Sequence, residues 1–307
     1  MKKSIFLLCA FVLSIGMLFA EEKEERPNHV PKVGSVSLGF TFNPASLASQ
    51  LKVQPKVGEF ARDFIKNDAS NRQMFMLSQD PIAALRLKVH AKEHLNIRAS
   101  IGFSGSHIQY SEYVRDDLAY TLNPNSEVKV SGDIQSKMNS TNVALGVEYS
   151  GGNGNLRFIA GFNLLYAFAD SKMTCRYGNQ LTPLNQVPST MALLGTPDVD
   201  LNEWQAAQGI AYARPIERHT KGFNQGIGAQ IDMGVEYYFM DHVSIGATVT
   251  FTPIMGVWQP QTYSVYEGYS SKSTQVETYN ALYSPGSWML LYGTQNLGVQ
   301  LSMNYYF

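Results

Sequence analysis

Apolar and polar residues alternate with a period of two along several stretches of this chain, and the last stretch is the clearest. Counting back from the end, every second residue is apolar or aromatic, and small or polar residues stand between. The apolar set is Val299, Leu301, Met303, Tyr305 and Phe307. Successive side chains of a strand point to opposite faces, so one face can meet lipid while the other faces a lumen. The pattern predicts a membrane-spanning strand.

The same alternation predicts seven further strands. They lie near Val33–Phe42, Ile82–Ala91, Leu95–Ser104, 143–149, 158–168, 227–239 and 243–251. Short connections at Glu93, Gly152 and Asp241 join three pairs of them, and such turns favour glycine, asparagine and aspartate. We therefore expect an all-β fold, an antiparallel transmembrane β-barrel of eight strands. Ten strands are the alternative if a longer connection contains a hairpin.

Four connections are long, covering residues 43–80, 111–140, 176–221 and 259–287. Bacterial barrels have short periplasmic turns and long external loops, so we expect these segments outside the cell and both termini in the periplasm. Loops of this length usually carry function. Between Lys56 and Lys66, apolar residues recur at helical spacing and predict a short amphipathic helix over the barrel mouth.

The N-terminal segment has the pattern of a cleaved secretory signal. Lys2 and Lys3 precede an apolar run from Ile5 to Ala20, which is too short to span a bilayer as a helix. The chain then divides into a signal peptide (1–20), a short periplasmic tail (21–31) and a single barrel (32–307). Without the signal, 22 of the 24 basic residues remain against 25 acidic ones. This balance favours no nucleic-acid partner.

Three features together resemble the small outer-membrane β-barrels of the OmpA/OmpX-like superfamily. They are the terminal aromatic strand, the glycine-containing alternating strand 234–239 and the return strand 243–247. The resemblance implies a bacterial outer-membrane location and contact with outer-membrane lipid. It also implies insertion by the barrel assembly machinery, with the alternating C-terminal residues as the assembly signal.

Charged residues occupy the positions between the outward apolar ones, where side chains point into the barrel. They are Arg86, Lys88, Arg98, Glu148, Arg157, Asp232 and Glu236. The lumen of an eight-stranded barrel is only wide enough for side chains, and buried charges must be paired. We expect a lumen charge network that plugs the barrel. A proton or ion path is the alternative.

One metal motif fits by spacing but not by geometry. Residues 90–94 read H-x-x-E-H, a zinc-peptidase pattern that requires both histidines on one helical face. Here His90 falls on a predicted strand, whereas Glu93 and His94 fall in a turn. Cys175 is the only cysteine of the predicted mature chain, so no disulfide framework exists. The sequence predicts no metal site and no cofactor.

A catalytic site at the outer rim of the barrel is the remaining hypothesis for an enzyme. Ser106, His107, Asp116 and Asp117 are candidates near the outer ends of strands. Isolated acids and serines are ordinary in polar loops, and their sequence spacing defines no nucleophile and base. We therefore predict that the protein is not an enzyme.

The last long connection is rich in tyrosine and lies between Trp258 and Trp288. The tyrosines are Tyr263, Tyr266, Tyr269, Tyr279 and Tyr283. Tryptophans at strand ends suit an interfacial girdle, and the tyrosines either pack within the loop or form a recognition surface for a protein or glycan. We predict a role in envelope structure or in docking through the loops, alone or within a larger envelope complex. A narrow channel or small-solute transporter and a rim-sited hydrolase are the alternatives.

Overall fold

A computed structural model of the 307-residue chain describes residues 29–43, 83–152, 154–194, 207–293 and 297–307. The predicted signal peptide, most of the predicted tail and the predicted helix at 56–66 lie outside these ranges. The strands are β1 (Val36–Phe42), β2 (Ala83–Lys92), β3 (Leu95–Arg115), β4 (Lys129–Gly151), β5 (Leu156–Arg176), β6 (Ile210–Thr220), β7 (Asn224–Met240), β8 (Val243–Gln259), β9 (Thr262–Ser270), β10 (Gln275–Ser284), β11 (Ser287–Tyr292) and β12 (Leu297–Tyr306). The helical segments are α5 (Asp117–Leu122) and a 3-10 turn (Ala192–Leu194). No helix among the described residues is long and apolar enough to cross a membrane.

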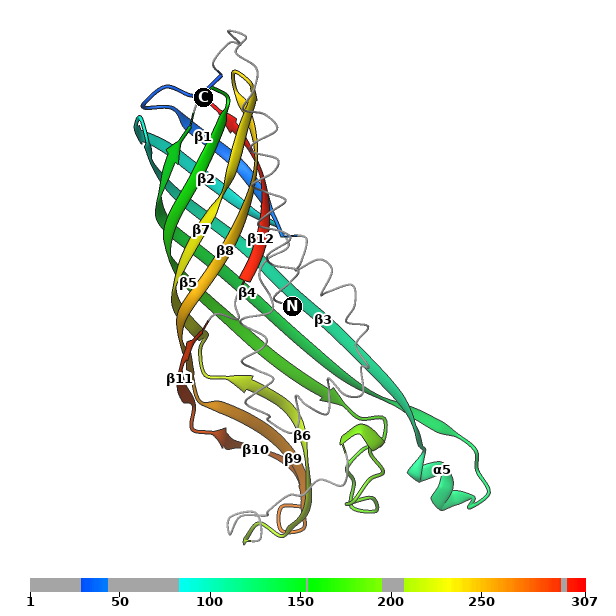
Figure 1. Ribbon diagram of the computed structural model, residues 1–307. Coiled ribbons are helices and arrows are strands. Elements are labelled where there is room, and N and C mark those ends of the chain that lie inside the picture. Colours follow the sequence, from blue (N-terminus) through cyan, green and yellow to red (C-terminus); the bar gives the residue numbers. More distant parts are fainter. Residues whose placement is uncertain (1–28, 44–82, 153, 195–206, 294–296) are drawn as a thin grey trace.

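Eight of the strands form a closed antiparallel ring (Figure 1). Their order around the ring is β1, β2, β3, β4, β5, β7, β8 and β12, and β12 pairs again with β1. The closing pair aligns Ser37 with Tyr306 and Phe42 with Leu301. These are the eight strands that the alternation predicts, and the predicted antiparallel barrel is confirmed.

The outward positions of the ring form an apolar belt. Its exposed members include Leu38, Phe40, Leu87, Ile97, Leu145, Phe158, Phe162, Leu164, Met233, Ile245, Leu301 and Met303. A water-soluble surface rarely exposes a contiguous apolar patch larger than a few hundred Å². A belt that runs around a barrel instead matches the lipid-facing band of outer-membrane barrels.

Three strands continue far beyond the belt. β3 and β5 have 21 residues each and β4 has 23, and the pairing of β3 with β4 runs without a break from Leu95–Tyr149 to Arg115–Lys129. A membrane-spanning strand needs only about 9–11 residues. The other half of these strands therefore projects past the barrel, as the lower right of Figure 1 shows.

The projecting strands are extended by β6, β9 and β10. β6 pairs with the outer end of β5, where Lys172 faces His219, then β9 pairs with β6 and β10 with β9. We call this assembly the outer sheet: the outer halves of β3, β4 and β5, together with β6, β9, β10 and α5. Its small apolar core contains Ile134, Met173, Cys175 and Met191, with Tyr110, Val114, Tyr177 and Leu194 packed around them.

The prediction of loops at 111–140, 176–221 and 259–287 is wrong in part, because these segments contain much of the outer sheet. Strands there meet water or protein on both faces, so they lack the apolar and polar alternation that lipid imposes. β9 and β10 do form a hairpin inside a predicted loop. It pairs outside the closed ring, so the ring keeps eight strands. Residues 44–80 lie outside the described ranges.

Candidate functional site

The lumen holds a buried network of ion pairs at the centre of the barrel. Lys88 on β2 places its Nζ 2.8 Å from Oε1 of Glu148 on β4 and 2.8 Å from Oε2 of Glu236 on β7. All three side chains are almost fully shielded from solvent. One ammonium group therefore joins three strands across the lumen.

Arg98 extends the network on β3. Its Nη1 lies 2.8 Å from Oε2 of Glu148, its Nε donates to Oδ1 of Asn163 at 2.8 Å, and its Nη2 pairs with Oδ2 of Asp232. Asn163 also donates to Asp232 at 2.8 Å. A Cβ at Gly161 would lie 2.5 Å from Nη2 of Arg98, so a glycine leaves the room that this guanidinium occupies.

Neutral polar side chains donate further hydrogen bonds to the carboxylate of Glu236. Its Oε1 accepts from Ser244 at 2.6 Å, from Asn304 at 2.8 Å and from Tyr306 at 2.9 Å. Its Oε2 accepts from Tyr238 at 3.0 Å. Sequence reasoning missed these partners, although each lies at an inward position of its strand. The period of two that places the charged residues inward also places these polar residues inward, and it could have been used to find them.

The structure brings five of the seven predicted lumen residues into one ion-paired network, namely Lys88, Arg98, Glu148, Asp232 and Glu236. Arg86 is buried beside them but forms no ion pair with any described residue. Arg157 lies apart at the turn between β4 and β5, where its Nη1 donates to the carbonyl oxygen of Gly152 at 2.6 Å. These two arginines therefore lie outside the ion-paired network that the other five residues form.

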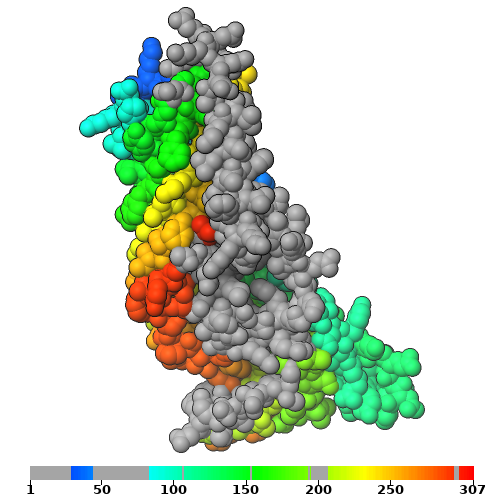
Figure 2. All heavy atoms as spheres, viewed as in Figure 1, coloured from blue at the N-terminus to red at the C-terminus, as the bar shows by residue number. Residues whose placement is uncertain are grey.

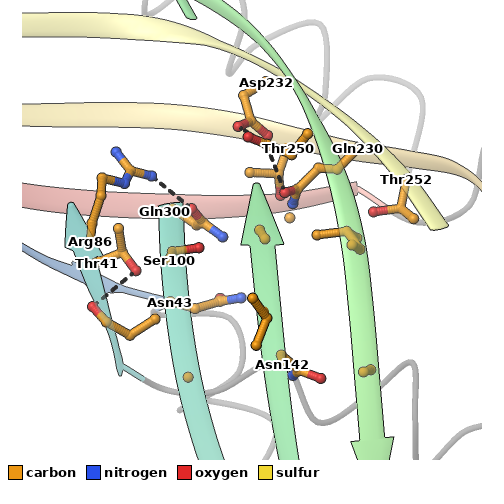
Figure 3. Close-up of a pocket in the computed structure, with 18 of the residues that line it drawn as sticks. Thr41, Asn43, Arg86, Ser100, Asn142, Gln230, Asp232, Thr250, Thr252 and Gln300 are labelled. Carbon is orange, nitrogen blue, oxygen red and sulfur yellow. Dashed lines mark hydrogen bonds between the residues drawn. The ribbon is translucent and has the colours of Figure 1, made fainter. Parts of the chain in front are cut away.

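A cavity of about 270 Å³ lies on the outer side of the ion-paired network (Figure 3). Arg98 and Asp232 border it, and residues farther along the strands, such as Asn142 and Ala167, complete its wall. Most of its polar lining consists of hydroxyl and amide groups, from Thr41, Asn43, Ser100, Asn142, Asn163, Gln230, Thr250, Thr252 and Gln300. This size falls near the lower end of small-molecule pockets.

The H-x-x-E-H residues do not converge. His90 is buried in the barrel, with its ring centroid 5.3 Å from that of Tyr306. Glu93 and His94 lie on the exposed turn between β2 and β3. Among the described residues, no three histidine, cysteine or acidic side chains are grouped as metal ligands would be.

Two of the four rim residues considered for catalysis, Asp116 and Asp117, have structural partners. Asp116 caps α5 by accepting a hydrogen bond from the amide of Ala119 at 3.0 Å. Asp117 accepts from the amide of Ser189 at 2.6 Å and from Asn185 at 3.0 Å. His107 is exposed on β3.

Asp117 fixes the segment after β5 against α5, outside the apolar belt. Burial opposes ionisation of its carboxyl group, but the hydrogen bonds from Ser189, Asn185 and Arg115 outweigh that effect. The pKa of Asp117 is therefore lowered from its ordinary value. The carboxylate is thus a structural anion at neutral pH.

The five predicted tyrosines of the last segment fall into three settings. Tyr266 and Tyr279 are cross-strand neighbours with stacked rings, 5.5 Å between centroids and 13° between planes. Tyr263 stacks on His219, and Tyr283 lies under the guanidinium of Arg218 at 3.6 Å. Tyr269 is buried and does not contribute to a surface.

Two tryptophans lie close to the C-terminal end of β8 and the N-terminal end of β11. Trp258 on β8 is directly opposite Trp288 on β11, and both are exposed on the outside of the barrel. Trp side chains favour the boundary between lipid and water because the ring is apolar and its N–H is polar. Both side chains face outward, as a girdle would require, and the interfacial girdle itself stays a prediction.

Comparison with solved structures finds bacterial outer-membrane proteins. OprG from Pseudomonas aeruginosa is 12% identical with a TM-score of 0.31, and the match covers 92% of this chain and 99% of that one. A major outer membrane protein from Thermus thermophilus is 12% identical with a TM-score of 0.34, covering 90% and 100%. The N-terminal β-barrel domain of Pseudomonas aeruginosa OprF is 10% identical with a TM-score of 0.30, covering 90% and 98%. No protein-family model and no curated protein matches the chain.

Proposed function

We propose that this protein is a non-enzymatic outer-membrane barrel that holds a rigid recognition sheet outside the bacterial cell. The barrel supplies the anchor, because its apolar belt suits the acyl chains of a bilayer. The difference in length between the connections at the two ends of the barrel supports an orientation with the outer sheet outside the cell. The turns after β2, β4 and β7 are short, whereas the outer sheet projects from the opposite end.

The lumen network supports an anchor rather than a wide channel. Lys88, Glu148 and Glu236 meet across the interior of an eight-stranded ring, where the available width is filled by side chains. Each of these charges has a partner at hydrogen-bond distance. Such pairing leaves none of these three groups free to hold a passing ion.

The continuous extension of β3, β4 and β5 beyond the belt is the observation that carries the proposal. A flexible loop loses conformational entropy when it binds, whereas a hydrogen-bonded sheet with its own core is already ordered. The outer sheet has such a core around Met173 and Met191. It is thus built to present a fixed surface at a distance from the membrane, which Figure 2 shows as the lower part of the molecule.

The β9–β10 hairpin is the part of that sheet best suited to contact a partner. Within the described residues, no strand pairs with the outer edge of β10. The half-buried Tyr266 and Tyr279 form a flat stacked pair on this hairpin. Aromatic faces of this kind bind sugar rings or apolar side chains with little loss of conformational entropy.

The experiment uses the full-length protein in nanodiscs as a probe of glycan arrays and of intact host and bacterial cells. We expect binding that Tyr279→Ser weakens, and that Tyr113→Ser, at an exposed tyrosine elsewhere on the outer sheet, leaves unchanged. Migration before and after boiling checks that each barrel is folded. Binding that is equal in both variants would contradict recognition by the hairpin.

A further inference from the structure

The buried guanidinium of Arg86 faces the lumen cavity without an anionic partner. Arg86 is 4% exposed, and its Nη1 has no hydrogen-bond partner among the described residues. Its one hydrogen bond to a described residue runs from Nη2 to Oε1 of Gln300, at 3.4 Å (Figure 3). A buried cation normally requires a paired anion and saturated hydrogen bonds, so this arrangement calls for a further partner.

The nearby carboxylates cannot serve, because other groups already hold them. Glu148 and Glu236 share Lys88, while Asp232 is paired through Oδ2 with Arg98. Oδ1 of Asp232 nevertheless has no partner among the described residues either, although it is buried. Figure 3 shows Arg86 and Asp232 on different strands of the cavity wall, β2 and β7. The side chains of Arg86 and Asp232, which carry these two unpaired atoms, therefore border the same cavity.

We propose that the lumen cavity binds a small organic carboxylate whose other end carries a hydroxyl or ammonium group. The carboxylate would accept hydrogen bonds from Arg86, and the donor at the other end would satisfy Oδ1 of Asp232. The hydroxyl and amide groups of Thr41, Ser100 and Gln230 border the same cavity and suit a polar ligand. A cavity of about 270 Å³ restricts the ligand to a small molecule.

Charge balance favours such a two-ended ligand over a simple anion. In the ion-paired network two cations, Lys88 and Arg98, face three carboxylates, which leaves one negative charge in excess. The positive charge of Arg86 offsets that negative charge from a distance. A bare anion would add negative charge beside Asp232. An ammonium group at the second end cancels this added charge, whereas a hydroxyl group there only lessens the cost by donating a hydrogen bond to Asp232.

The experiment titrates the full-length protein in micelles and follows the arginine Nε–H resonances by NMR. The probes are glycine and glycolate, which carry both groups, and acetate, which lacks the donor. We expect saturable shifts of the Arg86 resonance with glycine or glycolate, and binding of acetate that is weaker by about tenfold, the effect of one lost charge-assisted hydrogen bond. The matched control Arg176→Gln, at an exposed arginine, should bind as the unmodified protein does.

Arg86→Met separates ligand binding from a structural role. This variant loses the charge that offsets the third carboxylate from a distance, so resistance to unfolding should fall, but less than in Lys88→Met, which breaks two direct ion pairs. Ligand binding should fall by at least about tenfold. If this variant does not fold, Arg86→Lys keeps the charge and should still weaken binding, because the paired donors of the guanidinium are lost. The proposal is overturned if no probe gives a saturable shift, if acetate binds as well as glycine and glycolate, or if a folded Arg86→Met variant binds normally. These outcomes do not depend on recognition by the β9–β10 hairpin.

Discussion

The Nζ of Lys88 lies 2.8 Å from Oε2 of Glu236, and this contact joins two strands that are not neighbours in the ring. Lys88 belongs to β2 and Glu236 to β7, so the pair crosses the lumen. Backbone pairing alone holds each strand only to its two neighbours. The ion pair therefore adds a direct connection between opposite walls of the barrel.

Replacing Lys88 should destabilise the barrel strongly. In Lys88→Met, Glu148 and Glu236 lose their shared cation while they stay buried, and breaking a buried pair in this way costs about 3–5 kcal/mol. Unfolding in guanidinium chloride, followed in detergent micelles, measures the loss. Lys137→Met is the matched control, because Lys137 is exposed on β4. Equal stability of the two variants would show that the network does not hold the walls together.

The protein should not form stable single-channel steps in planar bilayers. Ion-paired side chains fill the interior of the ring, namely Lys88, Arg98, Glu148 and Glu236. Because these groups bind one another, they are not free to bind an ion that passes through the lumen. The measurement compares the unmodified protein with Glu236→Gln at matched protein amounts. Reproducible conductance that changes in size or selectivity in Glu236→Gln would show that the barrel is a channel and is not plugged.

Cysteine labelling of intact cells should reveal the orientation. Lys272→Cys, in the turn between β9 and β10, should react with a membrane-impermeant maleimide added outside the cells. Asp241→Cys, in the turn between β7 and β8, should react only after the outer membrane is permeabilised. Cys175 is buried and contributes little background. Labelling of position 241 alone in intact cells would reverse the proposed orientation.

Asp117 should make the outer sheet sensitive to acid. Its pKa is lower in the folded protein than in the unfolded chain, where aspartate has a pKa of about 3.9. Its stabilising contribution is therefore complete above the unfolded pKa and is lost as the pH falls through the folded pKa.

The amide of Ser189 donates to Asp117, so its NMR chemical shift reports this titration directly. We expect a midpoint below about 3.9, and no such transition in Asp117→Asn. A midpoint at or above the ordinary value would mean that the hydrogen bonds to this carboxylate do not outweigh its burial.

The outer sheet marks one limit of prediction from the sequence. Alternation of apolar and polar residues is a local property of a strand with lipid on one side, so β1, β12 and the six strands between them in the ring could be located in advance. β6, β9 and β10 carry no such pattern. Their positions depend on pairs such as Lys172 with His219, which join residues far apart in the chain.

The sequence by itself determined which face of each ring strand meets lipid, and therefore which charged residues point inward. Only the tertiary structure decided how those charges are shared. Lys88 is paired twice, Arg157 turns to a backbone carbonyl, and Arg86 is left facing a cavity. The physical reason is that inward direction follows from a period of two within one strand, whereas partnership across the lumen depends on the relative shift of all eight strands around the ring.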